Sequence, residues 1–308
     1  MQLDTLTLPR LQALLRVAAA GRPVLALWED GGRLSSLPGL SLDVLCALPA
    51  DLARSAIERS VGPPLDPGQV ELLAPADSQE VWAAGVTYIR SREARMEEAA
   101  QKDVYAMVYE AERPEIFFKA AGWRVVPSGG EAGIRADSRW DVPEPELALL
   151  TNSRGEVLGY SCGNDMSSRS IEGENPLYLP QAKVYHRSCS IGPGIVLAWH
   201  CDVSDIQLAM RIERAGETIF SGSARTSQLV RSPAAMAAVL HSSYPLPAGA
   251  WLMTGTGIVP DSPYTAEAGD IVEITIEGLG TLVNRLVRIP HSEATAPPRH
   301  RDPRLRSA

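Results

Sequence analysis

Residues 141–165, DVPEPELALLTNSRGEVLGYSCGND, contain two apolar stretches separated by a short polar segment. The first apolar run is 147–150, and the second is 157–163. Between them, residues 152–155 read NSRG, a composition that favours a tight turn. We therefore expect two strands joined by a turn.

Three carboxylates flank these strands. Glu144 and Glu146 are two residues apart, and positions i and i+2 of an extended chain point to the same face of a sheet. Pro143 and Pro145 withhold two backbone donors, which suits an edge strand or the entrance to a strand. Asp165 is expected at the end of the second strand. The sequence thus predicts that these acidic side chains gather at one place.

Like charges on one face repel and raise each other's pKa unless they share a cation. Glu144, Glu146 and Asp165 offer only carboxylate oxygens, which favours Mg²⁺, Mn²⁺ or Ca²⁺ over Zn²⁺. On spacing alone the alternative stays open that the Glu-Pro-Glu segment is a solvated edge and that Asp165 caps a helix.

Several short motifs follow one another along the chain in a defined order. They are GVTY at 85–88, PEIFFK at 114–119, EPELA at 144–148, GY at 159–160, ND at 164–165, SR at 168–169, AK at 182–183, GP at 192–193, TGTG at 254–257 and GLGTLVN at 278–284. In order and spacing, over roughly residues 79–289, this set resembles the fumarylacetoacetate hydrolase family. The resemblance implies an α+β fold, a mixed β-rich roll with a small N-terminal α/β lobe, assembled as dimers or tetramers.

The resemblance also implies the roles of the site residues. It makes Glu144, Glu146 and Asp165 the ligands of a divalent metal, with Mg²⁺ expected and Mn²⁺ or Ca²⁺ possible in its place. It makes Lys183 the active-site lysine, and either Lys183 or Glu115 is expected to act as the base. The further residues expected to bind substrate are Ser91, Arg92, Lys119, Glu172, Tyr178, Thr256 and Gly257.

One departure from the family pattern separates two branches of it. Family members that hydrolyse carbon–carbon bonds have a histidine and, three residues later, a glutamate where this chain has Ser91 and Ala94. The pattern of 88–95, 112–115 and 171–180 is similar instead to the branch that dehydrates 2-keto-3-deoxy sugar acids, such as those derived from D-arabinonate and D-xylonate. The missing pair therefore disfavours hydrolysis.

The resemblance implies a metal-dependent hydro-lyase that converts 2-keto-3-deoxy-D-pentonate to 2,5-dioxopentanoate in pentose breakdown. Two alternatives remain open. The first is another reaction through an enolate, as in an acylpyruvate hydrolase or an oxaloacetate decarboxylase or tautomerase. The second is a module that binds keto acids without turnover. Tyr178 could equally pack in the core, and the charged segment 90–109, with helical spacing, fits either a lid or a solvated helix.

Composition limits the partners of this chain. Its 308 residues are 45% hydrophobic and carry a net charge of −8, which disfavours a nucleic-acid partner or a membrane surface. No run of about 18 apolar residues is present that could span a bilayer. The four cysteines show no paired spacing, so reduced thiols in a cytoplasm are the simplest account. We expect a cytoplasmic enzyme whose partner is a small 2-keto acid.

The chain divides into three parts by composition. Residues 1–73 are expected to form the small N-terminal lobe, 74–290 the catalytic domain, and 291–308 a disordered tail. Within the lobe, the pattern of 8–20 predicts an amphipathic helix that ends at a glycine. Near the end of the domain, 269–289 predicts a β-hairpin around a glycine turn.

Overall fold

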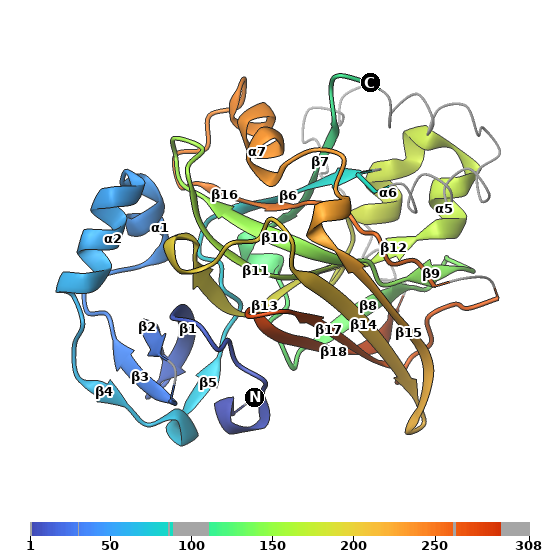
Figure 1. The fold of residues 1–308 in the computed structure, drawn as a ribbon. Helices are drawn as coiled ribbons and strands as arrows, with labels where there is room; N and C mark the ends of the chain where they lie inside the picture. The colour runs from blue at the N-terminus through green and yellow to red at the C-terminus, as the bar shows by residue number, and fades with distance from the viewer. Residues whose placement is uncertain (1, 30, 86, 89–110, 261–262, 291–308) are drawn as a thin grey trace, which may run out of the picture.

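The computed structural model describes residues 2–29, 31–85, 87–88, 111–260 and 263–290. Most of its strands belong to one 11-stranded mixed sheet that runs through the molecule (Figure 1). In spatial order its strands are β4 (Pro64–Leu65), β3 (Arg33–Ser36), β2 (Arg22–Glu29), β1 (Ala13–Ala19), β13 (Cys189–Leu197), β11 (Val157–Asp165), β10 (Pro145–Thr151), β16 (Ala250–Met253), β6 (Glu80–Gly85) and β7 (Glu115–Ala121), with β5 (Val70–Leu72) paired to β1.

A second, five-stranded sheet packs against the first. Its order is β15 (Glu217–Arg225), β14 (Gln207–Arg214), β17 (Ile271–Ile276), β18 (Gly280–Ile289) and β8 (Glu131–Arg135). The expected hairpin of residues 269–289 is confirmed as β17 and β18, which pair antiparallel. A short ribbon joins β9 (Asp141–Val142) to β12 (Ser167–Ser168). The expected β-rich α+β fold is therefore confirmed.

The helices are short and lie around the sheets. α1 and α2 lie at one end of the molecule, and α5 and α6 lie at the other end (Figure 1). The helices are α1 (Leu42–Ala47), α2 (Ala50–Arg59), α5 (Arg169–Glu174), α6 (Leu179–Lys183) and α7 (Pro233–His241), and the 3₁₀ turns are η1 (Leu3–Thr5), η2 (Pro67–Gln69), η3 (Gly122–Arg124), η4 (Pro176–Tyr178), η5 (Ala198–His200) and η6 (Thr226–Gln228). Among the described residues, no helix is long and apolar enough to cross a membrane.

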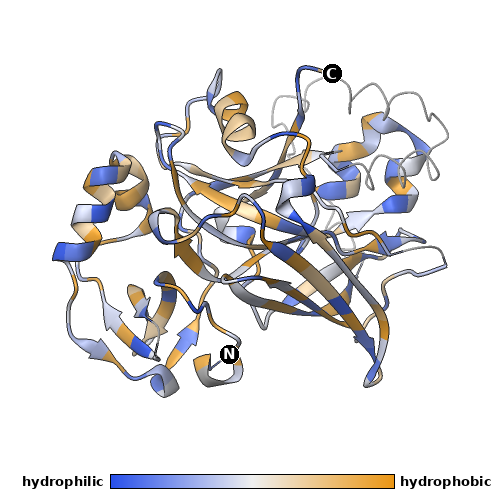
Figure 2. Ribbon diagram, viewed as in Figure 1, coloured by the Kyte–Doolittle hydropathy of each residue, from blue (hydrophilic) through white to orange (hydrophobic). Residues whose placement is uncertain are grey.

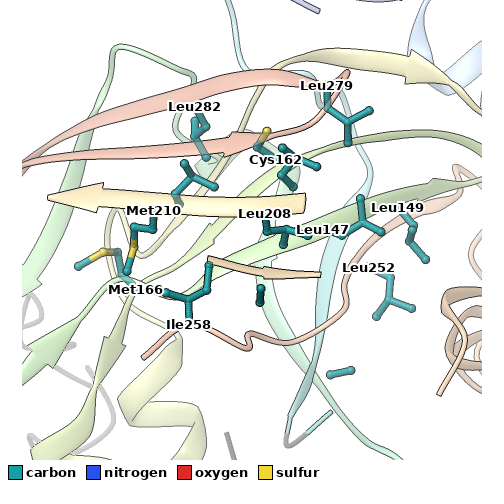
Figure 3. Close-up of a cluster of buried hydrophobic side chains, with 14 of the residues drawn as sticks. Leu147, Leu149, Cys162, Met166, Leu208, Met210, Leu252, Ile258, Leu279 and Leu282 are labelled. Carbon is teal, nitrogen blue, oxygen red and sulfur yellow. The ribbon is translucent and has the colours of Figure 1, made fainter. Parts of the chain in front are cut away.

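The hydrophobic core lies on both faces of β10. Leu147 and Leu149 point into the cluster between the two sheets, together with Leu208 of β14 and Leu282 of β18 (Figure 3). Leu150 points the other way, into a cluster that includes residues of α1 and α2. A strand buried on both faces needs an almost continuous apolar run, and burial of each leucine contributes about 1.5–3 kcal/mol. Hydrophobic residues accordingly follow the central strands through the molecule (Figure 2).

The hairpin of β10 and β11 forms as the sequence predicts. Its register pairs Glu146 with Gly163, and Pro145 is the first residue of β10. Because β10 lies between β11 and β16, Pro145 marks the entrance to a central strand and not an edge. In the turn, Asn152 Oδ1 accepts hydrogen bonds from two backbone N–H groups, and Gly155 has a φ of +80°.

The expected helix over residues 8–20 is wrong. Ala13–Ala19 is the strand β1, which pairs antiparallel with β2, β5 and β13. Ala20 and Gly21 both have positive φ, 49° and 74°, which is the backbone of a two-residue hairpin turn. The apolar spacing of this segment fits a helix or a buried strand, and the pairing with its sheet neighbours decides between them.

The strand β1 also ties the N-terminal segment to the rest of the molecule. Its pairing with β13 makes the strands before residue 73 continuous with the central sheet. Two other expectations concern 90–109 and 291–308, and both segments lie outside the described residues.

Candidate active site

Three buried carboxylates meet where β10 begins and β11 ends. Glu144, Glu146 and Asp165 each place one oxygen within 4.8 Å of the others. Antiparallel pairing brings them together, because the Asp165 backbone N–H donates to the Glu144 carbonyl at 2.9 Å. Each of these residues is at most 3% exposed. The gathering of acidic groups that the sequence predicts is therefore present in the fold.

Burial and mutual repulsion shape the charge of this triad. Burial raises the pKa of Glu146 well above its usual range, and the Asp165 and Glu144 carboxylates raise it further. Two smaller effects oppose this rise, namely the positive charge of Lys183 and the Gly255 N–H, which donates to Glu146 Oε2 at 2.6 Å. Ionisation of Glu146 is therefore disfavoured in this site.

Cations contact the other two carboxylates. The Lys183 ammonium donates to Glu144 Oε2 at 2.7 Å, to Asp165 Oδ2 at 2.8 Å and to Ser167 Oγ at 2.5 Å. Arg169 Nη2 lies 2.9 Å from Glu144 Oε1. All of these groups are buried, so their mutual attraction is weakly screened by solvent.

The donor set fits a hard divalent cation. Among the residues that the structure describes, Glu146 has a backbone donor but no cationic partner, so its ionised form leaves a negative charge without an ion pair. The oxygens of Glu144, Glu146 and Asp165 converge within 4.8 Å, and carboxylate-only ligation is what Mg²⁺, Mn²⁺ and Ca²⁺ prefer. A metal bound here would offset the charge of Glu146.

A pocket opens onto the triad. Its empty volume is about 380 Å³, which includes space open to solvent, and it is lined by residues of β6, β7, α5, α6 and the segment after β16. The lining residues are Ala84, Gly85, Glu115, Phe117, Glu144, Glu146, Asp165, Arg169, Glu172, Leu179, Lys183, Gly255 and Thr256. Acidic groups therefore dominate the polar wall, with Lys183 and Arg169 as its cations.

Comparison with known proteins places this site in a family. Residues 144–287 match the model of the fumarylacetoacetate (FAA) hydrolase C-terminal domain. The chain is 46% identical over 249 residues, 78% of its length and 86% of the other's, to a probable 2-keto-3-deoxyxylonate dehydratase of Haloferax volcanii. This chain belongs to the fumarylacetoacetate hydrolase family. It is also 41% identical over 219 residues, 70% of its length and 74% of the other's, to the 2-dehydro-3-deoxy-D-arabinonate dehydratase of Saccharolobus solfataricus.

A solved structure of this family has the same fold. It is a 2-keto-3-deoxy-D-arabinonate dehydratase complexed with magnesium and 2,5-dioxopentanoate, 33% identical in sequence with a TM-score of 0.80. The match covers 90% of this chain and 99% of that chain.

In this fumarylacetoacetate hydrolase fold, the two residues expected to act as the base and some of those expected to bind substrate reach the pocket. Glu115, Glu172 and Thr256 line it, as does Lys183. Lys119 does not line it, because the side chain is completely buried beneath Asp165.

Of the remaining expected residues, the two that the structure describes do not line the pocket. Tyr178 is 39% exposed on η4 and does not line the pocket. Gly257 packs against the ring of Tyr88, where a Cβ would lie 2.7 Å from a ring carbon. Ser91 and Arg92 lie outside the described residues.

The site also contains two residues, Arg169 and Ser167, for which the sequence motifs predict no role. Arg169 contacts Glu144 and lines the pocket, and Ser167 accepts a hydrogen bond from Lys183. Both follow Asp165 closely in the sequence, since they lie two and four residues beyond it. That proximity to a predicted ligand was the available signal.

Gly85 leaves room for the Glu115 carboxylate. The two residues are paired across β6 and β7, and a Cβ on Gly85 would lie 2.1 Å from Glu115 Oε2. We expect Gly85→Ala to displace this carboxylate and to lower kcat by about 10²-fold, the usual effect of misplacing a reacting group by roughly 1 Å. Steady-state kinetics check this, with circular dichroism to confirm the fold.

Gly68→Ala is the matched control, because a Cβ there meets Asp66 only at ordinary contact distance, 3.4 Å. Equal activity of the two alanine variants would contradict a catalytic position for Glu115.

Asp141 gives the fold a pH dependence. Burial raises its pKa to about 6, although Ser138, Arg288 and Arg135 oppose the rise. In the unfolded chain an aspartate has a pKa of about 3.9. The folded state therefore holds this proton more tightly, so the contribution of Asp141 to stability falls as pH rises from about 4 to 6 and stays low above that range.

We expect Asp141→Asn to remove this dependence and to stabilise the protein at pH 8 by about 1–3 kcal/mol. Urea unfolding at pH 4 and pH 8 measures the effect. A variant that is less stable than the parent at pH 8 would show that the charged carboxylate stabilises the fold.

Proposed function

We propose that this protein is a magnesium-dependent dehydratase that converts 2-keto-3-deoxy-D-pentonate to 2,5-dioxopentanoate. The observation that carries the proposal is the buried triad of Glu144, Glu146 and Asp165, with the Lys183 ammonium 2.7–2.8 Å from two of its oxygens. The names of the two relatives, and of the magnesium and product complex with the same fold, support it.

The two relatives' names describe one sugar acid. Removal of the C3 hydroxyl leaves C4 as the one stereocentre, and D-arabinose and D-xylose share its configuration. A single substrate is therefore proposed, with the D configuration at C4.

Glu144, Glu146 and Asp165 would hold the magnesium ion, which supplies Lewis-acid polarisation of the 2-keto acid and so acidifies the C3 protons. Glu115 and Lys183, which both line the pocket, are the groups proposed to act in proton transfer. Glu115 accepts a C3 proton as a carboxylate, and Lys183 holds positive charge beside the forming enolate.

The reaction then completes with loss of water. The electron pair of the broken C3–H bond forms a C3–C4 double bond, and the C4 hydroxyl leaves with a proton from a general acid. A proton shift from C5 to C3 converts this alkene to the C4–C5 enol, whose ketonisation gives the C5 aldehyde. Glu172 and Thr256, which line the pocket, are proposed to bind the hydroxyl-bearing end of the substrate.

A coupled assay tests this proposal. The purified protein is mixed with magnesium and 2-keto-3-deoxy-D-pentonate, and an NAD(P)-dependent semialdehyde dehydrogenase reports the aldehyde. A signal that EDTA abolishes and magnesium restores supports the dehydratase. Turnover of an acylpyruvate or of oxaloacetate, with no turnover of the sugar acid, would replace it with the hydrolase or the decarboxylase and tautomerase alternatives.

The assembly and location of the protein are part of the same proposal. We propose a homo-oligomer, a dimer or tetramer, as the sequence resemblance to the family implies. Leu177 and Trp123, which are 83% and 75% exposed in the single chain, are apolar side chains that such an assembly would cover. The four free cysteines suit a reducing cytoplasm. Light scattering of the purified protein measures the oligomer directly, and a monomeric mass at working concentration would exclude it.

A further inference from the structure

Lysine is rare in this chain, and two of its lysines lie at or near the candidate active site. Lys102, Lys119 and Lys183 are its lysines, whereas arginines provide the rest of its 29 basic residues. Lys183 lines the pocket, but Lys119 on β7 is 0% exposed and lies behind the wall. A buried ammonium costs desolvation free energy, so it persists only where its partners are well placed.

An irregularity in β7 directs Lys119 inward. Val81 pairs with Ala120 and the next residue, Trp82, pairs with Phe118, so Lys119 is the extra residue of a β-bulge. Phe118 is 37% exposed, whereas Lys119 and Ala120 are both buried. Bulges near active sites commonly re-aim a side chain, and here the re-aimed side chain is the lysine.

Three acceptors surround the Lys119 ammonium. It lies 2.5 Å from Asp165 Oδ1, and it donates to the Met166 carbonyl at 3.0 Å and to the Lys183 carbonyl at 2.5 Å. Two of the three ammonium protons are donated to these backbone carbonyls, and the contact with Asp165 Oδ1 is an ion pair. The charge and two of the donors of Lys119 are therefore engaged within the protein.

We propose that Lys119 is a positioning residue that joins Asp165 to the main chain of Lys183. The ammonium of Lys119 fixes the orientation of the Asp165 carboxylate, which would hold the metal. It also fixes the position of the Lys183 backbone at the end of α6, and so the position of the active-site lysine. This inference rests on the proposed function of the site. A compact ammonium suits the three closely spaced acceptors, whereas the planar guanidinium of arginine would not.

Two variants test this role. Lys119→Met keeps the length of the side chain without its charge, and Lys119→Gln keeps one polar donor and carries the test if the methionine variant does not fold. Magnesium affinity is measured by calorimetry in the absence of substrate. We expect it to fall by about 10–100-fold, as for other residues that orient metal ligands. Where the sugar acid is turned over, kcat should fall by a similar factor while KM changes less than about twofold.

Arg16→Met is the matched control. It removes an ion pair of similar length, 2.6 Å from Arg16 Nε to Asp77 Oδ1, in the N-terminal segment. The control should leave magnesium affinity unchanged even where it lowers the unfolding temperature.

Magnesium affinity within twofold of the parent in a folded Lys119 variant overturns the inference and leaves Lys119 a purely structural residue. A raised KM with unchanged magnesium affinity also overturns it, in favour of substrate binding. The calorimetry needs no sugar acid, so it tests the role of Lys119 independently of the dehydratase proposal. If that proposal is wrong, the parent protein will bind magnesium but will not turn over the sugar acid.

Discussion

Glu146→Gln is expected to abolish magnesium binding and to lower kcat by about 10³-fold or more, because a bound metal supplies several kcal/mol of charge stabilisation in such reactions. The same change should leave the metal-free protein as stable as the parent, or more stable. Glutamine keeps an oxygen that accepts the Gly255 N–H, and it removes a buried charge that Asp165 and Glu144 repel.

Calorimetric magnesium titration and thermal unfolding in EDTA measure the two effects. Glu58→Gln is the matched control, since Glu58 is exposed and pairs with Arg54 on α2. Magnesium-dependent turnover undiminished by the Glu146 change would remove Glu146 from the metal site.

Lys183→Met should lower kcat by about 10²–10⁴-fold, the range for losing a group that acts in proton transfer. Magnesium should still bind, because the three carboxylates remain. In the absence of metal the variant should be less stable by about 3–5 kcal/mol, since Glu144 and Asp165 lose a buried cationic partner.

Thermal unfolding with and without magnesium checks this reasoning. Magnesium should raise the unfolding temperature of Lys183→Met more than that of the parent, because the ion replaces the lost charge. Arg33→Met provides the control, because it removes the ion pair between Glu29 and the exposed side chain of Arg33. A Lys183 variant that keeps full activity would exclude Lys183 from catalysis.

The acidic triad can be predicted from the sequence because local geometry determines it. Alternation along an extended chain fixes the common face of Glu144 and Glu146, and the length of the hairpin returns Asp165 to the same end. Both facts follow from local geometry and turn composition. The apolar run of residues 147–150 likewise specifies a strand buried on both faces.

Other features depended on contacts that local sequence does not encode. The strand Ala13–Ala19 has an apolar pattern that also suits a helix, and its pairing with three strands decides its structure. The bulge at Lys119 is defined by the register of β6 against β7, so the sequence of one strand cannot reveal it. Its effect is to place behind the pocket a lysine that the motif alone suggests for substrate binding.

The most direct test of the central claim is to identify the product by ¹³C NMR. Labelled 2-keto-3-deoxy-D-pentonate is incubated with the protein and magnesium, and a parallel sample contains EDTA. We expect 2,5-dioxopentanoate, with an aldehyde carbon at C5 and a methylene at C4, in the magnesium sample alone. Pyruvate and glycolaldehyde, or unchanged substrate in the presence of protein with bound magnesium, would contradict it.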